Sequence, residues 1–133
     1  MADIFVGRLM SSPVETVRRE TPVREAATRL LEGDIGSLVV VDDDNAVVGI
    51  LTTTDFVRIT ADDTAAEATV GDYMSTDVTT AGANDSINDV AGTMIDNGVH
   101  HIPVVDDEAG VVGMLTTTDL TSYLATVEVP QPA

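Results

Sequence analysis

The chain contains no cysteine, no tryptophan and no lysine, and aromatic residues make up only 3% of its 133 residues. Without cysteine it can form no disulfide, no thiolate nucleophile and no cysteine-ligated metal site. The scarcity of aromatic residues predicts an aliphatic core, and a hydrophobic content of 44% is enough to build one. At this length we expect one compact unit, and we exclude a large multidomain enzyme.

Positive charge is also scarce. The chain has six arginines and 23 Asp and Glu residues, which gives a formal net charge of −17. This balance argues against nucleic acid or an anionic membrane as a partner, because both bind through basic groups that neutralise phosphate. It also predicts self-repulsion that molar salt relieves by shortening the screening length to about 3 Å. The composition resembles that of proteins from haloarchaea; a merely acidic mesophilic protein is the alternative.

Long apolar runs and several catalytic motifs are missing. The apolar stretches at 38–41 and 47–51 are far shorter than the roughly 20 residues of a transmembrane helix. The N-terminus lacks the basic segment and apolar run of a signal peptide, so we expect a soluble, cytoplasmic protein. There is no Gly-x-Gly-x-x-Gly, no P-loop lysine and no Ser-His-Asp set of supporting spacing. No reaction is specified, and we expect that the protein is not an enzyme.

A tandem repeat organises what is present. Three motifs recur 64 residues further along the chain: Val-Gly-x-x-Met-Ser at 6–11, Val-Val-Asp-Asp at 40–43 and Val-Val-Gly-x-Leu-Thr-Thr-Thr-Asp at 47–55. Two copies are too few for a solenoid, so we expect them to pack on each other as a pseudo-symmetric pair. We place the first repeat at 1–64, the second at 65–127 and a loose C-terminal tail at 128–133.

Each copy predicts the element order β-α-β-β-α, which makes the fold class α/β. In the first copy the expected elements are an extended segment at 14–17, a helix opened by Thr21-Pro22 and ended by Gly33, strands at 37–41 and 47–51, and a helix that starts at 53–55. In the second copy the extended segment is 78–80, Gly98 ends the first helix, and the strands are 102–105 and 111–115. The continuous Val-rich strands indicate burial on both faces.

The repeat resembles a pair of cystathionine β-synthase (CBS) domains, also called a Bateman module. The resemblance spans about residues 5–125 and is carried by the two Val-Gly-x-x-Met motifs, by His-Ile-Pro-Val-Val-Asp at 101–106 and by Gly-x-x-Thr-x-x-Asp at 49–55 and 113–119. The first copy departs at 37–40, where it has Ser-Leu-Val-Val, which weakens its site more than its fold. The resemblance implies two pseudo-symmetric repeats packed as a CBS-domain pair.

It also implies a function. A stand-alone regulatory module would bind AMP, ADP, ATP or S-adenosylmethionine in the cleft between its repeats, form a homodimer and act on an unidentified regulated protein. A triphosphate would bring about four negative charges to a strongly acidic chain, so we expect AMP or S-adenosylmethionine to bind in preference to ATP. The alternative is a ligand-free structural or dimerisation module.

The Thr-x-x-Asp motifs are compatible with both hypotheses, ligand binding and a ligand-free structural module. A helix N-terminus attracts anions, and a carboxylate there can accept hydrogen bonds from a ribose diol. The same spacing is close to a capping box, which only satisfies backbone N–H groups. The resemblance assigns ribose and phosphate contacts to Thr52, Asp55, Thr116 and Asp119. Since Thr53 or Thr54 could cap the helix instead, we treat the two roles as compatible.

His100 and His101 are the only histidines. Neighbours on an extended segment point to opposite faces and no third ligand is near, so we expect no metal site. In related modules a basic residue just before the x-Pro-Val strand reaches a ligand phosphate, which assigns that role to His100 or His101. A half-buried strand residue is the alternative.

The two clefts are expected to differ. By the resemblance, the Asp55 cleft receives His100 or His101 and has Arg58 nearby, whereas the Asp119 cleft receives only Gly36 and Ser37. We therefore expect the Asp55 cleft to bind a phosphorylated ligand more tightly. A solvated surface side chain is the alternative for Arg58. The expected apolar walls around adenine are Val14, Val39, Val78, Ile102 and Pro103.

Overall fold

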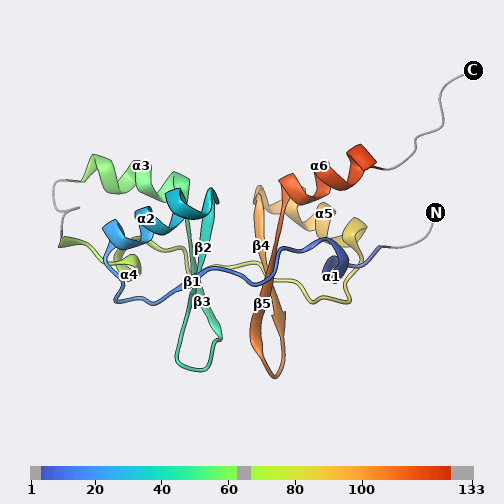
Figure 1. The fold of residues 1–133 in the computed structure, drawn as a ribbon, viewed down its shortest axis with the longest axis horizontal. Helices are drawn as coiled ribbons and strands as arrows, with labels where there is room; N and C mark the ends of the chain where they lie inside the picture. The colour runs from blue at the N-terminus through green and yellow to red at the C-terminus, as the bar shows by residue number, and fades with distance from the viewer. Residues whose placement is uncertain (1–3, 63–66, 127–133) are drawn as a thin grey trace, which may run out of the picture.

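The computed structural model describes residues 4–62 and 67–126. The predicted tail therefore lies outside the described residues. The elements in chain order are α1 (Val6–Leu9), β1 (Thr16–Val17), α2 (Val23–Gly33), β2 (Ser37–Val41), β3 (Val47–Thr52), α3 (Thr53–Ala61), α4 (Val70–Tyr73), α5 (Ile87–Asn97), β4 (His101–Asp106), β5 (Gly110–Thr116) and α6 (Thr117–Thr126). They form two similar halves side by side, with helices α3 and α6 at one end and two β-hairpins at the other (Figure 1).

The sheets follow the predicted hairpins. Strand β2 pairs with β3 antiparallel and with β1 parallel, and β4 pairs with β5 antiparallel. All five residues of β2 are buried, as expected for a Val-rich strand. The segment predicted to be extended at 78–80 forms no strand; a single parallel bridge joins Ala81 to Val104 instead.

The helix ends differ in detail from the prediction. Pro22, not Thr21, is the N-cap of α2, because its φ of −62° with a ψ of 142° already fits the extended cap conformation. Gly33 is the last residue of α2, and Asp34 ends the helix with a left-handed φ of 51°. Asp tolerates this region better than most residues. In the second half Gly98 ends α5 as predicted, with a φ of 63°.

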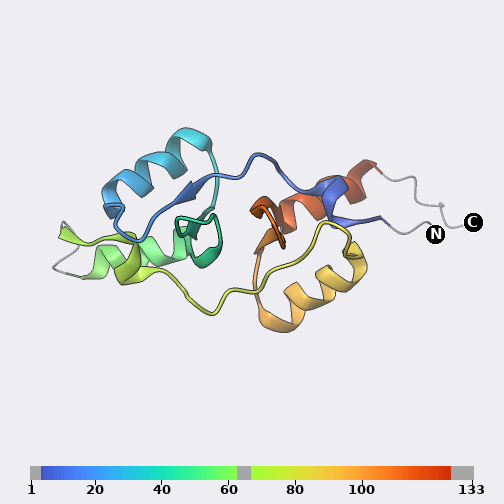
Figure 2. The same ribbon diagram turned by 90° about the horizontal axis from the view of Figure 1, so that it is seen from below.

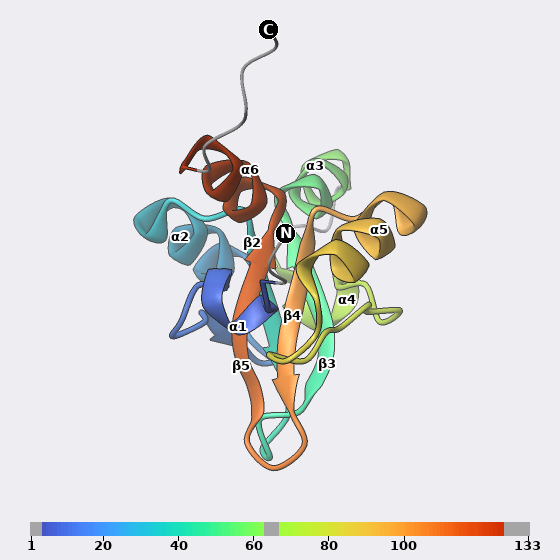
Figure 3. The same cartoon turned by 90° about the vertical axis from the view of Figure 1, so that its right-hand side faces the viewer.

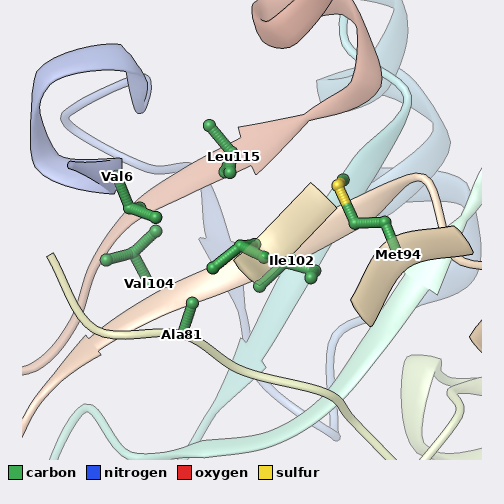
Figure 4. Close-up of a cluster of buried hydrophobic side chains, with 7 residues drawn as sticks. Val6, Ala81, Met94, Ile102, Val104 and Leu115 are labelled. Atoms are coloured by element: carbon green, nitrogen blue, oxygen red, sulfur yellow. The ribbon is translucent and has the colours of Figure 1, made fainter. Parts of the chain in front are cut away.

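Each half receives a short helix from the other repeat. The backbone N–H of Val6 in α1 donates to the Asp85 carbonyl at 2.9 Å, and that of Val70 in α4 donates to the Thr21 carbonyl at 2.8 Å. Val6 is fully buried in the core of the second half, beside Ala81, Val104 and Leu115 (Figure 4). The two repeats are thus interleaved, with α1 on the second half and α4 on the first.

Two repeated glycines make this exchange possible. A Cβ at Gly113 would lie 2.5 Å from the sulfur of Met10, and a Cβ at Gly49 would lie 2.5 Å from that of Met74. Ser11 pairs with Met114 and Ser75 pairs with Ile50 through isolated bridges. The glycine of each Gly-x-x-Thr-x-x-Asp motif is therefore the place where the other repeat's Val-Gly-x-x-Met segment crosses the hairpin.

A third core cluster joins the halves. Val39, Val41 and Ile50 of the first hairpin pack with Val111 and Met114 of the second. The two hairpins lie next to each other in the view from below (Figure 2), and in the view from the side the β4–β5 hairpin lies in front of the β2–β3 hairpin (Figure 3). At the tips the side-chain amide of Asn45 donates to the carbonyls of Ala109 at 2.9 Å and Val111 at 3.0 Å.

Candidate functional site

Two pockets lie where the repeats meet, and each is lined by both repeats. The larger one, the Thr116 pocket, has a volume of about 520 Å³ and is lined by Ser11, Pro13, Val14, Glu15, Asp34, Ile35, Gly36, Ser37, His100, His101, Met114, Thr116, Thr117 and Thr118. The smaller one, the Thr52 pocket, has a volume of about 340 Å³ and is lined by Ile50, Thr52, Thr53, Thr54, Ser75, Asp77, Val78, Thr79, Gly98, Val99, His100 and His101.

The pockets are pseudo-symmetric. Each one contains the end of a hairpin strand, the threonines that open the following helix, and the strand entrance of the other repeat. The interleaving explains this composition, because the crossing segments that contain Ser11 and Ser75 also form one wall of each pocket.

The histidines do not distinguish the pockets as expected. His100 and His101 line the Thr52 pocket, but they line the Thr116 pocket as well. The expectation that the Asp119 cleft receives only Gly36 and Ser37 is therefore wrong. The reason is the position of His101 at the start of β4: its Nε2 would lie 3.1 Å from a Cβ at Gly36, so its ring occupies the space that the missing side chain leaves.

The first Thr-x-x-Asp motif forms a capping box. Thr52 is the N-cap of α3, and its backbone N–H donates to Asp55 Oδ2 at 2.8 Å. The expectation that Thr53 or Thr54 caps this helix instead is wrong. The other carboxylate oxygen of Asp55 accepts from Arg58 at 2.5 Å, and Asp55 is only 2% exposed. Both oxygens are thus engaged within the helix, and Asp55 does not line the pocket.

The second motif is capped in the same way but is more open. The Thr116 N–H donates to Asp119 Oδ2 at 2.9 Å, and the Asp119 N–H donates to the Thr116 hydroxyl at 3.1 Å. Asp119 is partly exposed. The position of Arg58 is taken by Ser122, so no arginine within the described residues pairs with this carboxylate. Asp119, like Asp55, does not itself line its pocket; the threonines at 116–118 do.

His101 lies among groups that affect its charge. Burial lowers the pKa of the His101 imidazole below its usual value, and the neighbouring His100 lowers it further. The carboxylate of Asp119 acts in the opposite direction. His101 thus lines both pockets and lies within electrostatic reach of the second Thr-x-x-Asp motif.

Only two of the five expected adenine-wall residues line a pocket. Val14 lines the Thr116 pocket and Val78 the Thr52 pocket. Val39 and Ile102 are fully buried in the core, and Pro103 is less than 2% exposed; none of them lines a pocket. Strand alternation points their side chains into the packed layers. Arg58 is 66% exposed, pairs with Asp55 and lines neither pocket.

Met114, Ile50, Glu15 and Asp34 are lining residues that the sequence reasoning missed. Met114 and Ile50 occupy the same position in the two copies of Gly-x-x-Thr, and their place next to the motif was a usable signal. Glu15 and Asp34 reach the Thr116 pocket because the interleaved chain brings the ends of two separate segments together, which a linear motif does not reveal.

Within the described residues there is neither a cluster of metal ligands nor a helix that could span a membrane. No group of three or more His, Asp or Glu side chains between 4–62 and 67–126 is arranged to hold a metal ion. No helix in the same ranges is long and apolar enough to cross a membrane.

The fold and motifs agree with comparisons to known proteins. The CBS domain family model matches residues 6–68 and again residues 70–126. The chain therefore belongs to the CBS domain family and is a CBS-domain pair, as its resemblance implied.

Individual relatives support the same assignment. A 17.7 kDa protein of Acidianus ambivalens is 31% identical over 126 residues, which are 95% of this chain and 76% of that protein. The solved CBS-domain pair of protein MJ0100, in complex with 5′-methylthioadenosine and S-adenosylmethionine, superimposes with a TM-score of 0.87 at 29% identity, covering 93% of this chain and 98% of that one. L-aspartate semialdehyde sulfurtransferase of Methanocaldococcus jannaschii is 31% identical, but this chain covers only 22% of that enzyme.

Proposed function

We propose that this chain is a regulatory CBS module that binds an adenosine-containing small molecule in the pockets between its repeats. The observation that carries the proposal is the composition of the pockets. Each combines apolar side chains, threonine hydroxyls at a helix N-terminus and a strand entrance from the other repeat. A solved pair with the same fold and 29% identity is in complex with two adenosine derivatives.

Each pocket offers suitable partners for an adenosine. Adenine would pack on Val14 and Met114 in the Thr116 pocket, and on Val78 and Ile50 in the Thr52 pocket. The Thr116–Thr118 hydroxyls would hold the ribose in the Thr116 pocket. His100 and His101, which line both pockets, would meet a phosphate or a carboxylate on the ligand. AMP, ADP, ATP and S-adenosylmethionine are the candidate ligands.

A ligand-free structural module is the second candidate function. Both Thr-x-x-Asp motifs are occupied as capping boxes, and the ion pair with Arg58 uses the remaining oxygen of Asp55. In the Thr52 pocket the ribose would therefore depend on the hydroxyls of Thr53 and Thr54, which are exposed.

Assembly and location belong to the same proposal. Leu31 and Ile95 occupy equivalent positions on α2 and α5 and are 83% and 80% exposed, which supports a homodimer formed through helices. Light scattering at molar salt would give the mass of a dimer. We also place the module, and the protein it regulates, in the cytoplasm.

A thermal-shift series in about 2 M KCl tests the proposal against its alternative. The probes are AMP, ADP, ATP, S-adenosylmethionine and 5′-methylthioadenosine, with GMP as the control for the base. A ligand at 100 times its Kd adds about 2.7 kcal/mol to stability. A chain that none of the adenosine compounds stabilises would support the structural module instead.

Blocking variants locate the binding. Thr54→Trp and Thr118→Trp place a large side chain at an exposed position on the rim of one pocket each. We expect each to abolish binding in its own pocket. Ala125→Trp, exposed further along α6 and outside both pockets, is the matched control and should bind as the parent chain does.

A further inference from the structure

The two pockets differ in charge at equivalent positions. Glu15 and Asp34 line the Thr116 pocket, whereas the residues 64 positions later, Thr79 and Gly98, line the Thr52 pocket. The side chains of Glu15 and Asp34 are exposed, and no arginine or histidine in residues 4–62 and 67–126 forms an ion pair with them. The Thr116 pocket therefore carries two uncompensated carboxylates that its counterpart lacks.

The acids behind the pockets increase this difference. Asp119 follows the Thr116–Thr118 wall of the Thr116 pocket, and no arginine balances its charge, because Ser122 occupies the position equivalent to Arg58. Behind the Thr52 pocket the charge of Asp55 is balanced by Arg58 at 2.5 Å. The Thr52 pocket has one acid of its own, Asp77, whose counterpart is Pro13. The local formal charge is thus more negative around the Thr116 pocket.

The histidines cannot offset this asymmetry, because the same two line both pockets. The remaining lining residues of both pockets are uncharged. Adenosine metabolites differ in the charge of the 5′ substituent. In S-adenosylmethionine it combines a sulfonium with an ammonium and a carboxylate, for a net charge of +1; in 5′-methylthioadenosine it is a neutral thioether, and in AMP it is a phosphate. Two carboxylates attract the first and repel the last.

We propose that the two pockets sort adenosine ligands by charge: the Thr116 pocket selects a ligand with a cationic 5′ substituent through Glu15 and Asp34, and the Thr52 pocket takes a neutral or phosphorylated one. This inference rests on the proposed adenosine-binding function and adds the ligand class of each pocket. Glu15 and Asp34 act as specificity-determining residues. Their exchange for Thr79 and Gly98 removes two lining carboxylates, and the exchange of Pro13 for Asp77 restores only one.

The backbone permits a clean exchange of these residues. Asp34 has a φ of 51° and Gly98 a φ of 63°, so both helix ends have the left-handed conformation. The double variant Glu15→Thr/Asp34→Gly therefore installs the two residues of the Thr52 pocket and removes both lining carboxylates of the Thr116 pocket without requiring a new backbone conformation.

The test is calorimetric titration of the Thr54→Trp protein, in which only the Thr116 pocket is open. The probes are S-adenosylmethionine and S-adenosylhomocysteine, which differ by one methyl group and the sulfonium charge. We expect S-adenosylmethionine to bind roughly three- to tenfold more tightly, as contacts with two exposed carboxylates allow. Adding Glu15→Thr/Asp34→Gly should bring the ratio close to one.

Controls separate pocket charge from overall charge. Glu32→Gln/Asp96→Asn removes two exposed carboxylates outside both pockets and should leave the ratio unchanged. The reciprocal change Thr79→Glu/Gly98→Asp, made in the Thr118→Trp protein, should raise the preference for S-adenosylmethionine in the Thr52 pocket. Equal binding of the two probes in the Thr116 pocket, or a ratio that the double variant does not alter, would overturn the inference alone. Failure of every adenosine probe to bind either pocket would overturn the proposed function with it.

Discussion

Asp55 and Asp119 have the same motif and the same capping bonds but different surroundings. Asp55 is buried and has Arg58 on its second oxygen, whereas Asp119 is partly exposed and close to His101. A repeat in the sequence therefore does not ensure equivalent chemistry. Both aspartates cap their helices, but only the charge of the first is balanced by an arginine.

This difference predicts unequal costs of truncation. Asp119→Ala should lower the free energy of unfolding by about 1 kcal/mol, the usual cost of a lost cap. Asp55→Ala should cost more, up to about 3 kcal/mol, because it also leaves part-buried donors without an acceptor. Urea unfolding at fixed high salt measures both. Equal losses would show that the burial of Asp55 adds nothing.

The histidine between the pockets predicts a pH effect. Because the pKa of His101 is lowered in the folded state, the unfolded chain binds its proton more readily as pH falls below about 6.5. Stability should therefore decrease on going from pH 7 towards pH 5, and less steeply in His101→Gln. The groups facing the ring are His100, which opposes its protonation, and Asp119, which favours it. Identical pH slopes for parent and variant would contradict the shift.

Some of the residues that line the two pockets could be predicted from the sequence. Thr52 and Thr116 do line the two pockets, because a strand that leads directly into a helix puts its last hydroxyl at the junction. Which pocket His101 serves was not predictable. That depends on the absence of a side chain at Gly36 in the other repeat, which leaves room for the ring to reach both pockets.

Among the elements, the two hairpins hold the halves together at their tips. Asn45, at a left-handed φ of 64°, bonds through its side chain to Ala109 and Val111, and its carbonyl accepts from the Val111 N–H at 3.0 Å. Gly110 lies against that carbonyl with a φ of 79°. The contact is asymmetric, because the equivalent of Asn45 in the second repeat is Ala109.

We expect Gly110→Ala to destabilise the protein by on the order of 2 kcal/mol, since the new Cβ would overlap the Asn45 carbonyl and the backbone conformation suits glycine. Gly92→Ala is the control. It lies inside α5 with no atom within 4 Å of its Cβ position, and it should stabilise by up to about 1 kcal/mol. Thermal unfolding of both variants measures these changes. A Gly110→Ala protein as stable as the parent would show that the hairpin tips are not in firm contact.

The sequence predicted the elements better than their arrangement. The Val-rich strands and the helices ended by Gly33 and Gly98 were recovered, because the patterns that predict them are local in the sequence. The exchange of α1 and α4 was not recovered. Each is only four residues long, and its position depends on contacts such as Val6 with Asp85 and Met10 with Gly113, which are distant in sequence.

For the whole molecule, the net charge of −17 remains the dominant property. Only three ion pairs offset it within the described residues, and all three involve exposed arginine side chains. We therefore predict that the melting temperature rises with monovalent salt and that structure is lost below roughly 0.5 M. Circular dichroism across a KCl series measures this. An unchanged melting curve down to 10 mM would contradict the expected salt requirement.

The most direct test of adenosine binding between the repeats uses the two histidines, because the chain has no others and both line both pockets. Selective labelling of histidine gives two imidazole signals in an NMR spectrum. Titration with 5′-methylthioadenosine or S-adenosylmethionine in about 2 M KCl should shift the His101 signal, and that of its neighbour, along a saturable curve. Thr54→Trp combined with Thr118→Trp should abolish the shift. Calorimetric binding that leaves both imidazole signals unmoved would contradict our account, because the ligand would then lie outside the pockets.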